Sequence, residues 1–141
     1  MNVLSLFDGI SCGQIALNRT NICYDNYYSS EIDSNAIKVT QWNYPNTIQL
    51  GDVTKLKNLP NVNILIGGSP CQGFSFIGKG LNFNDERSKL FFEFVRILKE
   101  TSPKYFLLEN VKMKQEYQDV ISEYLGVLPI LIDSSFGVRP K

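Results

Sequence analysis

One cysteine, Cys71, stands in the most distinctive segment of the sequence, GGSPCQGFS at positions 67–75. The glycines around it, Gly67, Gly68 and Gly73, leave room for a flat substrate, and Pro70 fixes the approach of the backbone to the thiol. A free cysteine is usually a small buried apolar side chain, but this polar and glycine-rich setting does not suit a core position. We therefore expect Cys71 to act as a nucleophile.

A carboxyl group that could exchange a proton with a substrate of Cys71 is that of Glu109, in the segment FLLEN. The sequence contains no histidine, which excludes Ser-His-Asp and Cys-His catalysis and the histidine-containing zinc sites. Proton transfer therefore has to use other side chains, such as Glu109. The alternative is a structural role, in which Glu109 caps the following helix or pairs with Lys112.

Two more carboxylates follow apolar runs nearer the start of the sequence. Gly9 and Gly13, in FDGISCG, permit a tight turn that exposes backbone amides where a helix begins. Glu31 comes about twenty residues later, where a carboxylate can accept hydrogen bonds from ribose hydroxyls. Asp52, which follows Gly51, can accept one from the exocyclic amine of adenine. This set predicts an adenosine pocket; the alternative is that each carboxylate is a helix N-cap or first-turn residue.

Alternating strands and helices are expected to position these side chains. Apolar runs predict strands at residues 2–6, 24–30, 47–50, 63–66, 105–108 and 129–133. Helical patterns are present at residues 13–18, 34–42, 86–99 and 114–124. The third helix has the clearest apolar face, formed by Leu90, Phe91, Phe94, Val95 and Leu98. The alternation predicts an α/β fold, with a Rossmann-like parallel sheet and helices on both faces, in one domain over residues 1–141.

The composition is that of an ordinary globular domain. Its 14 basic and 14 acidic residues give no net charge, so nucleic-acid binding has to be argued from the site and not from a basic excess. No apolar run approaches the length of a membrane span, and the first residues lack secretory features, so we expect a cytoplasmic protein without a membrane partner. Cys12 and Cys23 are scattered in the sequence, and we expect them to be small buried side chains.

The motifs and their order resemble those of the DNA (cytosine-5) methyltransferase family. FDGISCG, Glu31 with Ile32, GDV, GGSPCQGFS, RSKLFFEF and ENV occur in the order of that family's motifs, over residues 3–111. The sequence segments FDGI, SPC and RSKLFFEF are most similar to those of the branch that contains the animal de novo enzymes and similar phage and bacterial proteins. The resemblance implies the S-adenosylmethionine-dependent methyltransferase fold, S-adenosylmethionine as the cofactor, no metal, and DNA as the partner.

The resemblance also implies a role for individual residues. In the family's pattern the cofactor pocket is formed by Phe7, Asp8, Gly9, Ile10, Cys12, Glu31, Ile32, Asp52, Val53 and Leu90. Cys71 would attack carbon 6 of a cytosine that is flipped out of the DNA, and Glu109 would supply a proton at ring nitrogen 3, so that carbon 5 can take the methyl group. The base would be contacted by Ser69, Pro70, Gln72 and Asn110.

Complete members of the family continue past Asp133 with a motif of two closely spaced arginines, a target-recognition region and two further motifs. We therefore expect the N-terminal catalytic part of a split or truncated enzyme, with a second chain supplying the rest in the split case. The alternative is a non-catalytic remnant that binds the cofactor or a partner. Zinc-dependent cytosine deamination would require a histidine and a second cysteine where Phe74 stands. A sister branch of the family acts on transfer RNA, but the sequence segment SPC favours DNA as the substrate.

Overall fold

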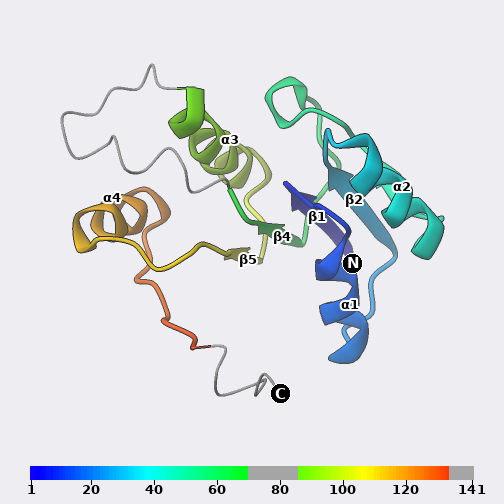
Figure 1. The fold of residues 1–141 in the computed structure, drawn as a ribbon, viewed down its shortest axis with the longest axis horizontal. Coiled ribbons are helices and arrows are strands. Elements are labelled where there is room, and N and C mark those ends of the chain that lie inside the picture. Colours follow the sequence, from blue (N-terminus) through cyan, green and yellow to red (C-terminus); the bar gives the residue numbers. More distant parts are fainter. Residues whose placement is uncertain (70–85, 134–141) are drawn as a thin grey trace.

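A five-stranded parallel sheet forms the centre of the computed structural model, which describes residues 1–69 and 86–133 (Figure 1). Its strands are β1 (Asn2–Leu6), β2 (Asn26–Ser30), β3 (Ile48–Gln49), β4 (Ile64–Gly67) and β5 (Tyr105–Leu108). They lie in the order β3-β2-β1-β4-β5, and every neighbouring pair is parallel. The order reverses between β1 and β4, which is where doubly wound sheets bind ligands at the carboxyl ends of their strands.

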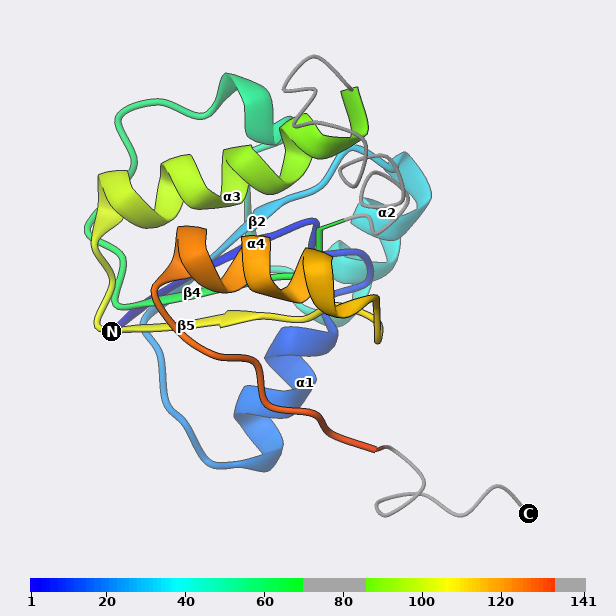
Figure 2. The same ribbon diagram turned by 90° about the vertical axis from the view of Figure 1, so that its left-hand side faces the viewer.

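Helices lie on both faces of the sheet, as expected (Figure 2). Helix α1 (Cys12–Arg19) covers one face, whereas α3 (Glu86–Thr101) and α4 (Gln115–Leu125) cover the other. Helix α2 (Ser34–Asn43) follows β2, and the short 3-10 helix η1 (Val53–Lys55) follows β3. Among the helices that the structure describes, none has both the length and the apolar character needed to cross a lipid bilayer.

The alternation of side chains along β1 produces two separate cores. Leu4 and Leu6 are fully buried in a cluster that includes Phe94 of α3. Val3 points to the opposite face, where it is buried with Leu17 of α1. Successive side chains of a strand point to opposite faces, so a central strand covered by helices on both sides is apolar throughout.

The predicted elements agree with the structure to within two residues at each end, with one exception. The strand predicted at 129–133 is wrong, because the structure has no regular element there and Ile130 is 86% exposed. An apolar run forms a strand only where a neighbouring strand pairs with its backbone. No strand in the described part of the chain pairs with this segment, and Pro129 has no N–H to donate.

Gly67, at the end of β4, has a packing role and not the substrate-facing role that its position beside Cys71 predicts. A Cβ atom at Gly67 would lie 2.9 Å from two ring carbons of Phe94 and 3.2 Å from the carbonyl oxygen of Leu6. The Phe94 ring is fully buried and has no space into which it could move. Glycine at this position therefore allows α3 to pack closely against the sheet.

Cys12 and Cys23 are exposed, so the expectation that they are buried is wrong. Cys12 is the first residue of α1, and Cys23 lies in the connection between α1 and β2. The core on this face is formed by the larger side chains of Val3, Leu17 and Tyr27. The residue type of Cys12 does not indicate which side of α1 faces this core.

Candidate active site

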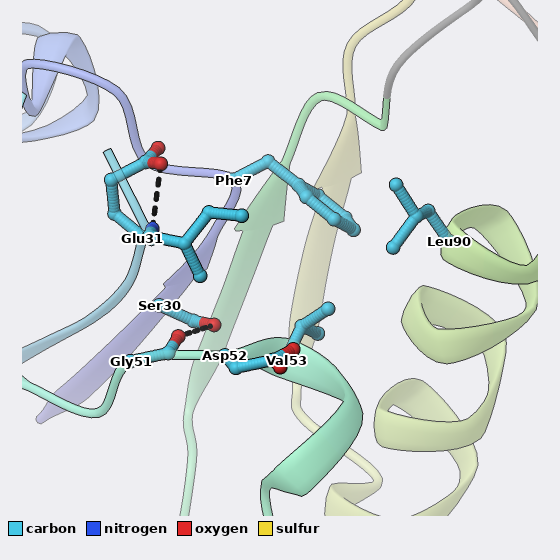
Figure 3. A pocket seen from close by; sticks show the side chains of 8 residues that line it. Phe7, Ser30, Glu31, Gly51, Asp52, Val53 and Leu90 are labelled. Atoms are coloured by element: carbon cyan, nitrogen blue, oxygen red, sulfur yellow. Dashed lines mark hydrogen bonds between the residues drawn. The ribbon is translucent and has the colours of Figure 1, made fainter. Parts of the chain in front are cut away.

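A pocket of about 220 Å³ lies at the carboxyl ends of β1, β2 and β3 (Figure 3). Its lining residues are Phe7 after β1, Ser30, Glu31 and Ile32 at the end of β2, Gly51, Asp52 and Val53 after β3, and Leu90 of α3. In Figure 3 the Phe7 ring and the Leu90 side chain point toward one another, with Val53 beside them. The pocket thus combines apolar surfaces suited to a flat ring with the carboxylates of Glu31 and Asp52.

Glu31 is held by backbone N–H groups from two segments. Its Oε1 accepts hydrogen bonds from the backbone N–H groups of Ile32 (2.7 Å) and Asp33 (2.9 Å), and its Oε2 accepts one from Gly9 (2.8 Å). A carboxylate has about four acceptor positions. The described residues fill three of these, which leaves one for a hydroxyl group in the pocket. Asp33, and not Glu31, is the N-cap of α2.

Asp52 lines the pocket and also caps η1, so the capping role is present, while its contact with an adenine amine stays a prediction. Its Oδ1 accepts hydrogen bonds from the hydroxyl group (2.8 Å) and the backbone N–H (3.0 Å) of Thr54. These bonds, the hydroxyl first, lower the pKa of Asp52 below its ordinary value of 3.8, and Lys55 at 3.5 Å acts in the same direction. The carboxylate is therefore charged at neutral pH, and this contribution to stability is lost only in acid, as the pH falls through the lowered pKa.

Ser30 and Gly51 also line the pocket, although neither is among the residues predicted for it. The Ser30 hydroxyl donates a hydrogen bond to the Gly51 carbonyl oxygen (2.7 Å), which joins the end of β2 to the loop after β3. Figure 3 shows this bond at the base of the pocket. Gly51 has a φ of +76°, which favours glycine. Ser30 is the last residue of β2, and Gly51 directly follows the apolar run at 47–50. Their positions at strand ends were the sequence signal that could have assigned them to the pocket.

Four other residues predicted for the cofactor pocket lie outside the lining that the structure describes. Gly9 reaches the pocket only through its hydrogen bond to Glu31. Asp8 accepts hydrogen bonds from the hydroxyl groups of Tyr27 and Ser11. The remaining two, Ile10 and Cys12, are exposed. Their roles as direct cofactor contacts stay predictions.

Glu109 lies beside the strand that leads to Cys71. The register of β4 and β5 pairs Gly67 with Leu108, and the Glu109 N–H donates to the Gly67 carbonyl oxygen (2.8 Å). A Cβ atom at Gly68 would lie 3.1 Å from Glu109 Oε2, so the carboxylate group lies directly against Gly68. Glu109 does not cap the next helix, because the N-cap of α4 is Lys114. The exposed Glu109 side chain is therefore available at the sheet edge.

Two residues predicted to contact the base, Ser69 and Asn110, follow the same two strands. Ser69 is buried, and its Oγ has no hydrogen-bond partner among the described residues; the same holds for Nδ2 of Asn110. Buried polar atoms without partners are rare in folded proteins, and a bound substrate is one way to satisfy them. Pro70, Cys71 and Gln72 lie outside the described residues.

The strand order and the pocket at the strand ends define a Rossmann-like α/β domain of the kind that binds nucleotide-like ligands. The crystal structure of S. pombe Dnmt2 methyltransferase matches this fold with a TM-score of 0.72 and 26% sequence identity, over 89% of this chain and 40% of that one. A mutant DNMT2 from Spodoptera frugiperda matches with a TM-score of 0.67 and 26% identity, over the same shares of the two chains. The fold is that of S-adenosylmethionine-dependent methyltransferases.

The sequence comparisons define the family more closely. The family model for C-5 cytosine-specific DNA methylases matches residues 1–123. The orphan methyltransferase M.SPRI of Bacillus phage SPR is 43% identical over 116 residues, which are 79% of this chain and 26% of that protein. The type II methyltransferase M1.ScrFI of Lactococcus lactis subsp. cremoris is 46% identical over 112 residues, which are 78% of this chain and 28% of that protein. The chain belongs to the C-5 cytosine-specific DNA methylase family, which confirms the resemblance, and it spans about a quarter of the length of these relatives.

Proposed function

We propose that this chain is the cofactor-binding and nucleophile-bearing part of an enzyme that transfers a methyl group from S-adenosylmethionine to carbon 5 of cytosine in DNA. Two features on one edge of the sheet support this function. The first is the pocket with two carboxylates at the ends of β1, β2 and β3. The second is the Glu109 carboxylate against Gly68, three residues before Cys71 in the sequence. Membership of the family supports the class of reaction.

The lining residues fit the adenosine part of S-adenosylmethionine. Phe7, Val53 and Leu90 offer apolar surfaces to the adenine ring. The carboxylate of Asp52 can accept a hydrogen bond from the exocyclic amine, and Glu31 retains one acceptor position for a ribose hydroxyl. When bound, S-adenosylmethionine supplies a methyl group on a sulfonium, which activates that group for transfer.

The catalytic roles follow from the chemistry of a thiol and a carboxyl group beside a flipped cytosine. The thiolate of Cys71 adds to carbon 6 of the ring, and Glu109 delivers a proton to ring nitrogen 3. Electron density then moves to carbon 5, which becomes nucleophilic enough to take a methyl group. Loss of the carbon 5 proton to solvent, departure of the thiolate from carbon 6 and return of the nitrogen 3 proton to Glu109 restore the neutral aromatic ring, and Cys71 is free again.

Recognition of the base is assigned to polar groups beside the nucleophile. The base must leave the duplex stack before a thiol can reach carbon 6. The buried Oγ of Ser69 and Nδ2 of Asn110 are then available to the edge of the extruded base, and this would give both atoms a partner that they do not find among the described residues. Pro70 and Gln72 are proposed to contact the same base.

The cofactor assignment predicts that Asp52→Asn weakens the binding of S-adenosylhomocysteine about ten-fold, which is the size of one lost hydrogen bond to a charged group. Asparagine caps helices as well as aspartate does, so η1 should stay intact. Asp33→Asn is the matched control, because Asp33 caps α2 in the same way, with the Asn35 N–H at 2.7 Å, but does not line the pocket. Isothermal titration calorimetry on the full chain measures both affinities.

Equal affinities for the two variants would contradict the assignment of Asp52 to the adenine amine. Absence of any S-adenosylhomocysteine binding by the unmodified chain, and by its complex with the second polypeptide proposed below, would contradict the proposed function itself. The pKa of Asp52 lies below 3.8, so the comparison between the variants should be the same at every pH from 6 to 8.

We also propose that a second polypeptide covers the outer face of β5 and supplies the target-recognition region. Tyr105 and Leu107 are 58% and 59% exposed on one face of β5, while Phe106 and Leu108 pack into the core on the other. The segment 127–132 adds further exposed apolar side chains, namely Val127, Leu128, Ile130, Leu131 and Ile132. Exposed apolar patches of this kind are typical of protein–protein interfaces. We call the covering polypeptide the companion chain.

The companion chain is expected to bind through β5, so Leu107→Glu should weaken the complex at least ten-fold by placing a charge in an apolar interface. The polypeptide encoded directly downstream of this gene is the candidate to co-express and purify, and surface plasmon resonance gives the affinity. Trp42→Glu is the matched control, because Trp42 is an exposed apolar side chain on α2, away from β5. Equal weakening by both variants, or unchanged binding of Leu107→Glu, would contradict the assignment of β5 as the interface.

A further inference from the structure

The loop between β1 and α1 has an unusual backbone conformation. Phe7, Gly9 and Ser11 have φ angles of 57°, 58° and 62°, in the left-handed region that side-chain-bearing residues rarely adopt. Two of the three are not glycine, so contacts outside the loop have to hold it in this form. The loop determines where Phe7 lies in the pocket and where the Gly9 N–H points.

Two of the contacts that hold the loop are made by the carboxylate of Asp8. Its Oδ1 accepts a hydrogen bond from the Tyr27 hydroxyl (2.8 Å), and its Oδ2 accepts one from the Ser11 hydroxyl. Both donors are fixed, because Tyr27 is 2% exposed and Ser11 is fully buried. A Cβ atom at Gly13 would lie 2.7 Å from the Tyr27 hydroxyl oxygen, so the absence of a side chain there makes room for this oxygen.

The Tyr27 hydroxyl is a permanent donor. Burial raises the pKa of Tyr27, and the nearby charge of Asp8 raises it further, so the phenol stays protonated throughout the range in which proteins function. The hydroxyl can therefore donate a hydrogen bond to Asp8 throughout that range.

The other end of the loop is joined to Glu31. The Gly9 N–H donates to Glu31 Oε2, and Tyr27 and Glu31 lie on or directly after the same strand, β2. The end of β2 thus holds the loop through three hydrogen bonds: from Tyr27 to Asp8, from the Gly9 N–H to Glu31, and from the Asp8 N–H to the Ser30 carbonyl oxygen (3.3 Å). A shift of the loop at Asp8 would remove the Gly9 N–H from Glu31 and alter the orientation of that carboxylate.

We propose that Asp8 and Tyr27 are positioning residues for the cofactor, which set the orientation of Glu31 through the loop without touching the ligand themselves. This inference rests on the proposed function, because it gives the hydrogen bonds of Asp8 and Tyr27 a role in the pocket that would bind S-adenosylmethionine. It changes the role of Asp8 from a direct contact to an indirect one. It also gives a function to a buried tyrosine outside the sequence motifs.

Tyr27→Phe removes only the hydroxyl, and we expect it to weaken S-adenosylhomocysteine binding by the full chain about ten-fold. Tyr24→Phe is the matched control, because Tyr24 lies near Tyr27 and donates to Gln14 Oε1 (3.0 Å), but has no bond to the loop. The control should change the affinity less than two-fold. Calorimetry measures the affinities, and thermal unfolding measured on both variants reports the loss of stability separately.

A double-mutant cycle with Glu31→Gln distinguishes positioning from a general structural effect. If Tyr27 acts through Glu31, Tyr27→Phe should change the affinity less than two-fold once Glu31 is already glutamine. The inference is overturned if Tyr27→Phe lowers the melting temperature but leaves the affinity of the otherwise unmodified chain unchanged. It is equally overturned if the ten-fold effect persists in the Glu31→Gln background. Absence of binding both by the unmodified chain and by its complex with the companion chain would be a failure of the proposed function, which is a separate outcome.

Discussion

Cys71→Ala is expected to reduce methyl transfer to DNA to the assay background, a loss on the order of 10⁴-fold or more, because removal of a covalent nucleophile leaves only binding and positioning. The measurement is the transfer of a tritiated methyl group from S-adenosylmethionine to cytosine-containing DNA. It uses the assembled enzyme, meaning this chain together with the proposed companion chain. Binding of S-adenosylhomocysteine should remain within about two-fold, since Cys71 is not assigned to the cofactor pocket.

Cys23→Ala is the control for this experiment. Its thiol is exposed and does not line the described pocket, so transfer should continue at the rate of the unmodified enzyme. Full activity of the Cys71→Ala variant would exclude the covalent route. Loss of activity in the control would place the nucleophile elsewhere in the chain.

Glu109→Gln has the second largest expected effect, a fall of about 10²–10⁴-fold in the single-turnover rate, because glutamine cannot deliver a proton to the base. Glutamine keeps the size of the side chain, so its fit against Gly68 should be preserved. The position of Glu109 rests on backbone contacts, including its N–H bond to the Gly67 carbonyl oxygen, which the substitution leaves in place. Rapid-quench measurement with DNA in excess over the cofactor reports this rate directly.

Glu123→Gln, on α4, is the matched control, because Glu123 is exposed and lies away from the strand ends. The single-turnover rate of the Glu123→Gln variant should equal that of the unmodified enzyme. A Glu109→Gln rate within three-fold of the unmodified enzyme would show that the proton reaches the ring by another route, and the role given to Glu109 would be wrong.

The strands and helices were predictable because the signals that define them are local. The apolar face of α3 and the apolar runs of β1 and β5 follow from side-chain periodicity alone. The segment 129–133 has the same apolar character but forms no strand, because a strand also needs a neighbour with which its backbone can pair. Periodicity contains no information about the availability of such a neighbour.

The pocket was predictable in part, and for a topological reason. The carboxyl ends of parallel strands meet at one edge, so the order of the strands and carboxylates in the sequence is enough to bring Glu31 and Asp52 together. The contacts that position them were not predictable in this way. The Tyr27 hydroxyl reaches Asp8 across 19 positions of sequence, and Phe94 fills the space beside Gly67 across the β4 to α3 connection. Contacts like these depend on distances between elements, which spacing in the sequence does not give.

The central claim, that Cys71, which follows β4 in the sequence, attacks a flipped cytosine, is tested most directly by mapping a trapped intermediate. In DNA that contains 5-fluorocytosine, the fluorine cannot leave as the carbon 5 proton does, so the enzyme stays bound to the base. Proteolysis and mass spectrometry of the assembled enzyme with this DNA and S-adenosylmethionine then identify the modified peptide. We predict a methylated fluorocytosine adduct on Cys71; cofactor binding without an adduct on the peptide that contains Cys71 would contradict the claim and favour a non-catalytic binding domain.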